Sequence, residues 1–335
     1  MVAKKRSIFS LMLESNNVGI LAILIVMLVI MIILEPKFLG YNNFDVIAGT
    51  VSVTALVGMA QMVIIGMGGL NLSVGALGGA VGVFTGLFME RMGLPILISI
   101  ILAVLIGVIG GVINGLIVSR VGSVGAIAIG PVCFLTTLAT TSIFQGFNGG
   151  ISQGVPFYNL PAAYKAFALS HLVGIPWVLI VTLIVTIFLG FLYNYSSFGK
   201  QVLAVGGNIK AAVLSGINIR RVIVLSFTIS GILSAIAAIL VTARLKYVEP
   251  NVGLNWLLFS FAIPLIGGTR LAGGKISVFG TFVGAVIIAV IQSALVFLNI
   301  NMYWNTLIQG AIIFGVVSID RIRTINNERR EHAIR

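Results

Sequence analysis

Long apolar runs, separated by short polar or glycine-rich segments, fill most of the 335-residue chain. Ten runs are candidate membrane-spanning helices, because a helix needs roughly 17–25 mainly apolar residues to cross the hydrocarbon core of a bilayer. They cover residues 18–34, 46–67, 70–89, 94–119, 124–147, 172–193, 222–243, 254–266, 278–298 and 302–319, of which 254–266 is short. The pattern predicts an all-α integral membrane protein with about ten transmembrane helices, built as a single transmembrane domain over residues 1–335.

The composition indicates that lipid is the solvent of this chain. Hydrophobic residues make up 59% of it and charged residues only 8%, with a mean hydropathy of +1.16. A typical soluble domain carries about 25% charged residues. So few charges cannot cover a globular surface in water, which excludes a soluble enzyme, a disordered chain and a secreted disulfide scaffold. The single cysteine, Cys133, lies in an apolar run and is expected to pack there.

The formal charge of +12 predicts an orientation in the membrane rather than nucleic-acid binding. Cytoplasmic loops of membrane proteins are enriched in Lys and Arg. With the N-terminus inside, fifteen of the twenty basic residues fall on the cytoplasmic side and five fall outside. This split predicts that the N- and C-termini are both cytoplasmic. Segments 1–17, 194–221 and 321–335 are then cytoplasmic, and 148–171 is the largest segment outside.

No acidic residue lies inside a predicted span, and neither His171 nor His332 does. Proton-coupled carriers use buried Asp, Glu or His as a relay, so this absence argues against them, and more weakly against sodium-coupled carriers. The segment GTRLAGGKI misses the phosphate-binding frame G-x-x-x-x-G-K-[ST] by an extra glycine before Lys275. No catalytic triad or metal cluster can be assembled. We therefore expect a pore-forming subunit that is not an enzyme, binds no cofactor of its own, and is either passive or driven by a partner.

The polar residues that do enter the spans are mostly amides and hydroxyls, which bond neutral polyols without a counter-ion. The candidates for a translocation pathway are Asn71, Ser73, Asn114, Gln145 and Gln292. The alternative for each is that it holds two helices together. Glycines between Gly66 and Gly75 predict at least one broken helix there, which membranes tolerate only where the break lines a cavity or is covered by protein.

Glycines at every fourth position predict close helix packing. Gly107, Gly111 and Gly115 form a G-x-x-x-G-x-x-x-G ridge within the run 94–119. Because glycine has no side chain, two helix backbones can approach closely and gain dispersion contact, which is a main source of helix association in lipid.

Four stretches in family order resemble the inner-membrane permease of ribose-, xylose- and galactoside-type ABC importers. They read GGLNLSVG from residue 68, GVINGLIVS from 111, FGKQVLAVGGNIKAAVLSGINI from 198, and IGGT from 266 followed by two glycines at 273–274. The resemblance runs from about residue 17 to 323. One departure is that the family's GGIDLSVG has an Asp where this chain has Asn71.

The resemblance implies a permease that dimerises with an identical or different copy, receives a sugar from a periplasmic or lipoprotein solute-binding protein, and couples to a cytoplasmic ABC ATPase, which binds the ATP. It implies a multi-pass protein of the bacterial inner (plasma) membrane that works by alternating access. The third stretch implies an ATPase-coupling segment, made by Asn208, Lys210, Ala211, Ala212 and Gly216. The alternatives are a nucleoside or branched-chain amino acid ABC permease, a stand-alone secondary carrier or channel, and a purely structural membrane protein.

Overall fold

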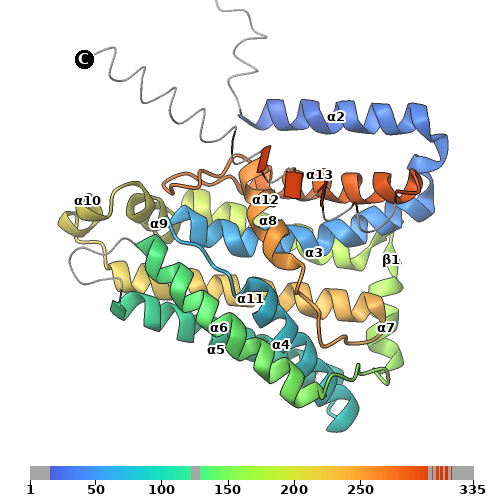
Figure 1. Ribbon diagram of the computed structural model, residues 1–335, viewed down its shortest axis with the longest axis horizontal. Helices are drawn as coiled ribbons and strands as arrows, with labels where there is room; N and C mark the ends of the chain where they lie inside the picture. The colour runs from blue at the N-terminus through green and yellow to red at the C-terminus, as the bar shows by residue number, and fades with distance from the viewer. Residues whose placement is uncertain are drawn as a thin grey trace, which may run out of the picture.

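The computed structural model describes residues 16–121 and 129–300, together with scattered positions between 304 and 318. This part of the chain is helical almost throughout (Figure 1). The α-helices are α2 (Asn16–Leu34), α3 (Tyr41–Gly66), α4 (Val74–Gly86), α5 (Ile96–Val121), α6 (Ile129–Ser152), α7 (Ala162–Leu169), α8 (Trp177–Tyr195), α9 (Ser197–Gly207), α10 (Ile209–Leu214), α11 (Ile219–Leu245), α12 (Trp256–Ile266) and α13 (Val278–Phe297). A 3₁₀ turn, η1 (Pro36–Leu39), precedes α3, and a π turn, η2 (Leu87–Arg91), follows α4. Strands β1 (His171–Leu172) and β2 (Ile175–Pro176) form an antiparallel hairpin before α8.

Every predicted span up to residue 298 overlaps an α-helix. Within the described residues, five helices are long and apolar enough to cross a bilayer, namely α3, α5, α8, α11 and α13. The all-α membrane fold is therefore confirmed, whereas the total of ten spans stays a prediction. Segment 1–15 and the tail 321–335 lie outside the described residues, as does the span 302–319 apart from scattered helical positions.

Two helix boundaries differ from the apolar runs for reasons that are visible in the hydrogen bonds. Helix α4 begins at Val74 rather than at 70, because Asn71 bonds the backbone N–H of Ser73 instead of joining a helix. Helix α6 continues through Asn148 to Ser152, although the sequence placed 148 in the outside segment. The hydroxyl of Ser152 bonds the Asn148 carbonyl oxygen, so the polar last turn stays helical.

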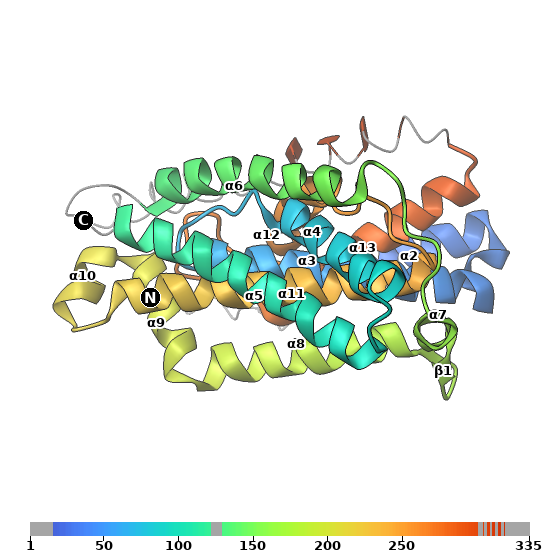
Figure 2. The ribbon, with the colours of Figure 1, turned by 90° about the horizontal axis from the view of Figure 1, so that it is seen from below.

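Helix α3 is the centre of the bundle. Of its most apolar 18-residue window 89% is buried, against 28% for α5 and 22% for α8. Helices α8, α11, α12 and α13 pack around α3, while α4 lies among α5, α6 and α11 (Figure 2). Helix α2 lies at the edge, along α13, where Met31 packs with Val290 and Ala294.

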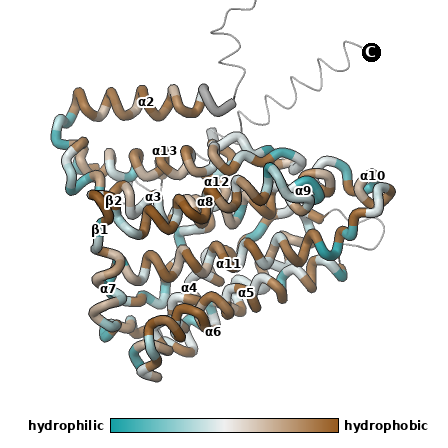
Figure 3. The backbone as a smooth tube through the Cα atoms, turned by 180° about the vertical axis from the view of Figure 1, so that it is seen from behind, coloured by the Kyte–Doolittle hydropathy of each residue, from teal (hydrophilic) through white to brown (hydrophobic). Residues whose placement is uncertain are grey.

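The surface of the bundle matches a membrane environment. Figure 3 shows hydrophobic colour along most of the helices and hydrophilic colour gathered at the two ends, by α9 and α10 at one and by α7 and β1 at the other. Large apolar side chains are exposed along the outer helices, among them Ile33 on α2 (73%), Leu97 on α5 (69%) and Ile187 on α8 (71%). Lipid solvates these side chains without the cost that water would impose.

Candidate functional site

A buried polar network lies where α3 ends and α4 has not yet begun. Three of the predicted pathway residues meet in it. Asn114 on α5 donates from Nδ2 to Ser73 Oγ (2.9 Å), and Ser73 donates from Oγ and from its backbone N–H to Asn71 Oδ1 (2.8 and 3.0 Å). Asn71 in turn donates from Nδ2 to the hydroxyl of Ser230 on α11 (3.1 Å). Side chains from α5 and α11 are thereby tied to the segment between α3 and α4.

Two further side chains hold the backbone of this segment. Gln61 on α3, in the amide orientation that satisfies both groups, donates to the Asn71 carbonyl oxygen (2.8 Å) and accepts from the Asn71 N–H (3.1 Å). Thr137 on α6 accepts from the Leu72 N–H (3.0 Å). A buried backbone group without a partner costs about 1–3 kcal/mol. The network therefore stabilises a non-helical segment that would otherwise be unfavourable inside a membrane protein.

The three predicted pathway residues of the network are almost fully shielded from solvent. Asn71, Ser73 and Asn114 are all buried, and neither of the two cavities described below includes any of them. Asn114 Oδ1 and the hydroxyl of Ser226 are the buried polar atoms nearby that have no partner among the described residues. In the structure, the three residues thus hold the segment between α3 and α4 in place through hydrogen bonds. A role for them in solute passage stays a prediction.

Gln145 and Gln292 lie apart from the network, in two separate cavities. Gln145 lines a cavity of about 330 Å³ near the C-terminal end of α6. Gln292 lines a cavity of about 430 Å³ between the start of α3 and the end of α13. In the second cavity the hydroxyl of Ser293 donates to Asn43 Oδ1 (2.6 Å). The five predicted pathway residues therefore occupy three places.

The glycine ridge of α5 lies against α11. An added Cβ would lie 2.6 Å from the Gly231 carbonyl oxygen at Gly107, 2.9 Å from the Thr228 Cα at Gly111, and 2.7 Å from the Val224 Cα at Gly115. Distances this short leave no room for a side chain. The ridge brings the backbones of α5 and α11 into contact, and this contact sets Asn114 within reach of the network.

The predicted coupling segment forms two short helices, α9 and α10, at the end of the molecule (Figures 1 and 2). Asn208 separates them and caps α10, because its Oδ1 accepts from the Ala211 N–H (3.0 Å). Gly216 ends the segment with a φ of +76°. Ala212 is buried, whereas Lys210 and Ala211 are exposed. Helix α10 thus presents a fixed surface beyond the bundle.

Glycines from three distant stretches meet beside this segment. The Gly274 N–H donates to the carbonyl oxygen of Gly66, the last residue of α3 (3.0 Å). An added Cβ at Gly206 would lie 2.6 Å from the Gly274 nitrogen, and one at Gly273 would lie 2.8 Å from the Gly68 nitrogen. We call the contact of Gly66, Gly206 and Gly274 the glycine junction. It joins the end of α9 directly to the segment that carries the polar network.

Charged side chains gather at the opposite end of the bundle. His171 Nε2 lies 2.9 Å from Asp45 Oδ1, and the Arg244 guanidinium donates to the Asp45 carbonyl oxygen (3.2 Å). Burial raises the pKa of the Tyr164 phenol on α7, whose hydroxyl bonds Thr242 (2.8 Å). These contacts attach the segment between α6 and α8 to α3 and α11.

Sequence reasoning missed several residues that the structure brings together. Gln61 had a usable signal, because it is the sole amide in the apolar run 46–67. Ser230 and Thr137 had none, since hydroxyls are common in membrane helices and usually bond their own backbone. Asn148 was assigned to the outside segment, yet it is buried at the end of α6.

The bundle and its buried uncharged network define a class, that of polytopic membrane proteins with polar side chains in their interior. Comparison with known proteins gives the family. Residues 43–317 match the family described as branched-chain amino acid transport system / permease component, and the chain belongs to this family. No solved structure matches the chain.

Similar proteins span nearly the whole chain. The D-allose transport system permease protein AlsC of Escherichia coli is 33% identical over 321 residues, which is 96% of each chain. The ribose import permease protein RbsC of Bacillus subtilis is 33% identical over 301 residues, covering 89% of this chain and 90% of the relative. The galactose/methyl galactoside import permease protein MglC of Salmonella typhimurium is 28% identical over 315 residues, covering 91% and 94%.

These matches confirm the resemblance to ABC sugar-importer permeases. They assign the chain to transport rather than to enzymatic catalysis. Together with the apolar helices, they establish a multi-pass protein of the inner membrane.

Proposed function

We propose that this chain is the permease subunit of an ATP-binding-cassette importer that moves a sugar or a similar neutral polar solute inward across the membrane. The observation that carries the proposal is similarity over about nine-tenths of the chain or more to permeases named for allose, ribose and galactose. The uncharged interior supports it. The polar side chains of the buried network are amides and hydroxyls, which bond sugar hydroxyls without needing an opposite charge.

The energy would come from partners. A cytoplasmic ABC ATPase would bind and hydrolyse ATP, so the permease itself needs no cofactor. A periplasmic or lipoprotein solute-binding protein would deliver the solute, and a second permease copy, identical or different, would complete the pore. The proposed topology has ten spans, with both termini in the cytoplasm and a broken helix between α3 and α4.

The mechanism would be alternating access. Closure of the ATPase pair would displace α10, and α9 would move with it because the two helices pack against each other. The glycine junction would pass this displacement to the end of α3 and to the network segment. ATP would thus favour one of two packings of the bundle, because the ATPase binds ATP more tightly when the bundle has that packing.

The runner-up is a permease for branched-chain amino acids, which the family description names, or for nucleosides. A zwitterionic amino acid brings two charges into the pathway, and a buried charge needs a paired partner. The charged side chains on α3, α5 and α11 sit at the helix ends, such as Asp45, Arg120 and Arg244. This placement favours a neutral solute.

Reconstitution tests the proposal. The permease, its ATPase and its binding protein are placed in liposomes with ATP, and uptake of labelled D-allose, ribose, galactose, leucine and uridine is measured. We expect import of at least one sugar, abolished by an ATPase variant that cannot hydrolyse ATP. Import of leucine or uridine alone would establish the runner-up, and sugar uptake by the permease without partners would establish a stand-alone carrier.

A further inference from the structure

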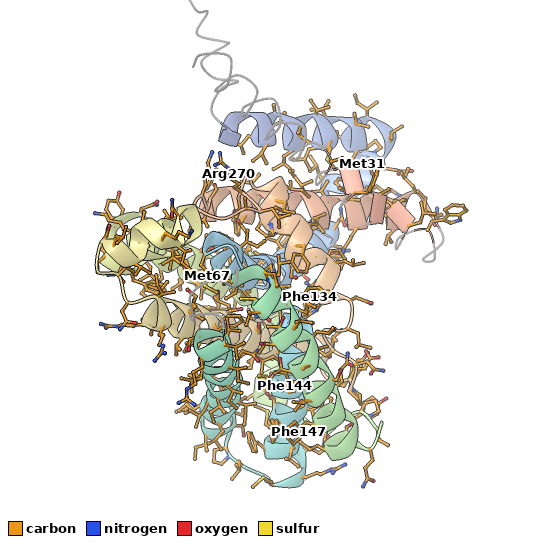
Figure 4. The ribbon with its side chains drawn as sticks, turned by 60° about the vertical axis from the view of Figure 1, so that its left-hand side comes forward. Met31, Met67, Phe134, Phe144, Phe147 and Arg270 are labelled. Atoms are coloured by element: carbon orange, nitrogen blue, oxygen red, sulfur yellow. The ribbon has the colours of Figure 1, made fainter. Side chains whose placement is uncertain are left out.

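The cavity near the C-terminal end of α6 has the features of a ligand site. Its walls come from α4, from α6 and from the loop before α12, with a volume of about 330 Å³. This lies at the lower end of the range for small-molecule pockets, about 300–1,000 Å³. Figure 4 shows this part of α6 through Phe144 and Phe147, well away from Phe134 near the start of the helix and Met67 at the end of α3. The cavity is thus distinct from the polar network.

Three amides supply the polar part of the lining, Gln145 and Asn148 from α6 and Asn251 from the loop. All residues that line the cavity are uncharged. Apolar surface comes from Ala76, Val252 and Leu254. A lining of amides beside apolar side chains suits a molecule that has hydroxyl groups on some faces and C–H groups on others.

Asn148 gives the sharpest indication of a missing partner. It is 6% exposed, and its Oδ1 is buried without any hydrogen-bond partner among the described residues. Its Nδ2 makes one long bond, 3.4 Å, to the Ala76 carbonyl oxygen. Buried side-chain acceptors are normally satisfied, and each exception calls for an explanation. A hydroxyl group in the cavity would donate the hydrogen bond that Asn148 Oδ1 lacks among the described residues.

The position of Asn148 is built by close packing. An added Cβ at Gly79 on α4 would lie 2.6 Å from both Asn148 Nδ2 and the Val252 carbonyl oxygen. The missing side chain at Gly79 therefore lets α6 and the loop converge on α4 and enclose the cavity. The amide is held at this place by its surroundings rather than left to rotate into solvent.

We propose that this cavity is an outer entry site, where a neutral polyhydroxylated solute the size of a monosaccharide binds through Gln145, Asn148 and Asn251 before it crosses the membrane. The proposal rests on the proposed import function and on the predicted orientation, which places the end of α6 outside. The unpartnered Asn148 Oδ1 accepts a hydrogen bond from a solute hydroxyl, and the other two amides add hydrogen bonds at the rim. The uncharged lining disfavours an amino acid zwitterion.

Thiol labelling with protection tests the site. The native Cys133 is fully buried, so an introduced cysteine gives a clean signal. Leu254→Cys places a reporter on the cavity wall without removing an amide, and Val173→Cys, at the 94% exposed tip of the hairpin, is the control. Each variant is assembled with the ATPase in proteoliposomes and treated with a membrane-impermeant methanethiosulfonate, with and without D-allose, ribose or galactose. We expect the imported sugar to slow labelling of Leu254→Cys several-fold and to leave Val173→Cys unchanged.

A second variant set tests the amides. Asn148→Ala in the Leu254→Cys background should raise the half-protecting sugar concentration about tenfold, the loss expected for one hydrogen bond. Asn251→Ala, on an exposed loop position, serves if Asn148→Ala does not assemble. Asn159→Ala, an exposed amide that does not line the cavity, should have no effect.

The outcomes separate this site from the import function. Equal labelling with and without a sugar that the wild-type complex imports would overturn the site and leave the function standing. Protection that appears only when the binding protein is added would also overturn it, because the binding protein would then be covering the cavity. The site would also be overturned if Asn148→Ala and Asn251→Ala both left the half-protecting sugar concentration unchanged. Failure of the wild-type complex to import any sugar would remove the function, and the site with it.

Discussion

The contact between α5 and α11 yields a quantitative prediction for Gly111→Val. A Cβ at Gly111 would lie 2.9 Å from the Thr228 Cα and 3.0 Å from the Phe227 carbonyl carbon. Carbon atoms in favourable contact are about 3.5–4.0 Å apart. The obstructing atoms belong to the backbone of α11, which cannot rotate away. The two helices must therefore separate by roughly 0.5–1 Å before the two methyl groups of valine are even accommodated.

The expected cost follows from this separation. A gap of about 0.5–1 Å removes a quarter to a half of the attraction at each former contact. Inserting carbon atoms into a packed interior typically costs about 1–3 kcal/mol of the free energy of unfolding. The higher helix propensity of valine over glycine offsets only a few tenths of a kcal/mol. For a protein of this size the thermal midpoint Tm should fall by a few degrees.

Gly190→Val on α8 is the matched control, because an added Cβ there meets nothing within 4 Å. The assay is the Tm of the purified protein in detergent, measured for wild type and for both variants. We expect Gly190→Val to melt like wild type and Gly111→Val to melt below it. If both variants melt at the same temperature, close approach of α5 and α11 does not stabilise the bundle and the packing argument fails.

Three further predictions concern the network and the coupling segment. Asn71→Leu removes the three side-chain hydrogen bonds of Asn71 and should lower the free energy of unfolding by about 2–3 kcal/mol, measured as a lower Tm, whereas a Tm equal to wild type would show that the network is not stabilising. Asn208→Ala removes the cap of α10, worth about 1 kcal/mol locally, and should lower import per ATP hydrolysed, while Asn208→Asp keeps the acceptor and the coupling. Ala211→Glu on the exposed side of α10 should leave membrane insertion intact and uncouple ATP hydrolysis from uptake, and normal uptake would contradict the coupling role.

The membrane fold is predictable from the sequence because its determinant is local. A helix in lipid satisfies its own backbone and needs only a sufficient apolar run, so the runs alone locate nine of the helices up to residue 298, but not the short helices α7, α9 and α10. The first and last residues of the helices are less predictable, because they depend on single hydrogen bonds. In the sequence, Asn71 and Ser73 lie in the predicted span 70–89. In the structure, the Ser73 N–H donates to Asn71 Oδ1 instead of joining a helix, and α4 begins only at Val74.

The candidate site was only partly predictable, because its residues meet through packing of distant helices. The sequence singled out Asn71, Ser73 and Asn114 as polar residues in apolar runs, and the structure brings these three together. It offered no reason to join them to Ser230, since that contact depends on how the segment between α3 and α4 packs against α11. Asn148 was missed for a different reason, because the apolar run that predicted the helix ends at residue 147.

The glycine junction connects the proposed ATPase contact to the polar network over a short distance. Gly206 lies in the last turn of α9, next to the Gly274 nitrogen and the carbonyl oxygen of Gly66. Three backbones touch here with no side chain between them. A displacement of α9 must therefore move Gly66, or break the hydrogen bond from Gly274, rather than be absorbed by a flexible side chain.

This geometry makes Gly206 the position where a single methyl group should separate ATP hydrolysis from import. Gly206→Ala forces the junction apart, whereas Gly207→Ala adds the same methyl group one residue later, where nothing lies within 4 Å. Neither change touches the exposed side of α10, so the ATPase can still dock. We expect Gly206→Ala to keep ATP hydrolysis and to lose import in proteoliposomes, with Gly207→Ala close to wild type. Equal import by the two variants would mean that the displacement reaches the bundle by another route, such as the contact of α9 with α11.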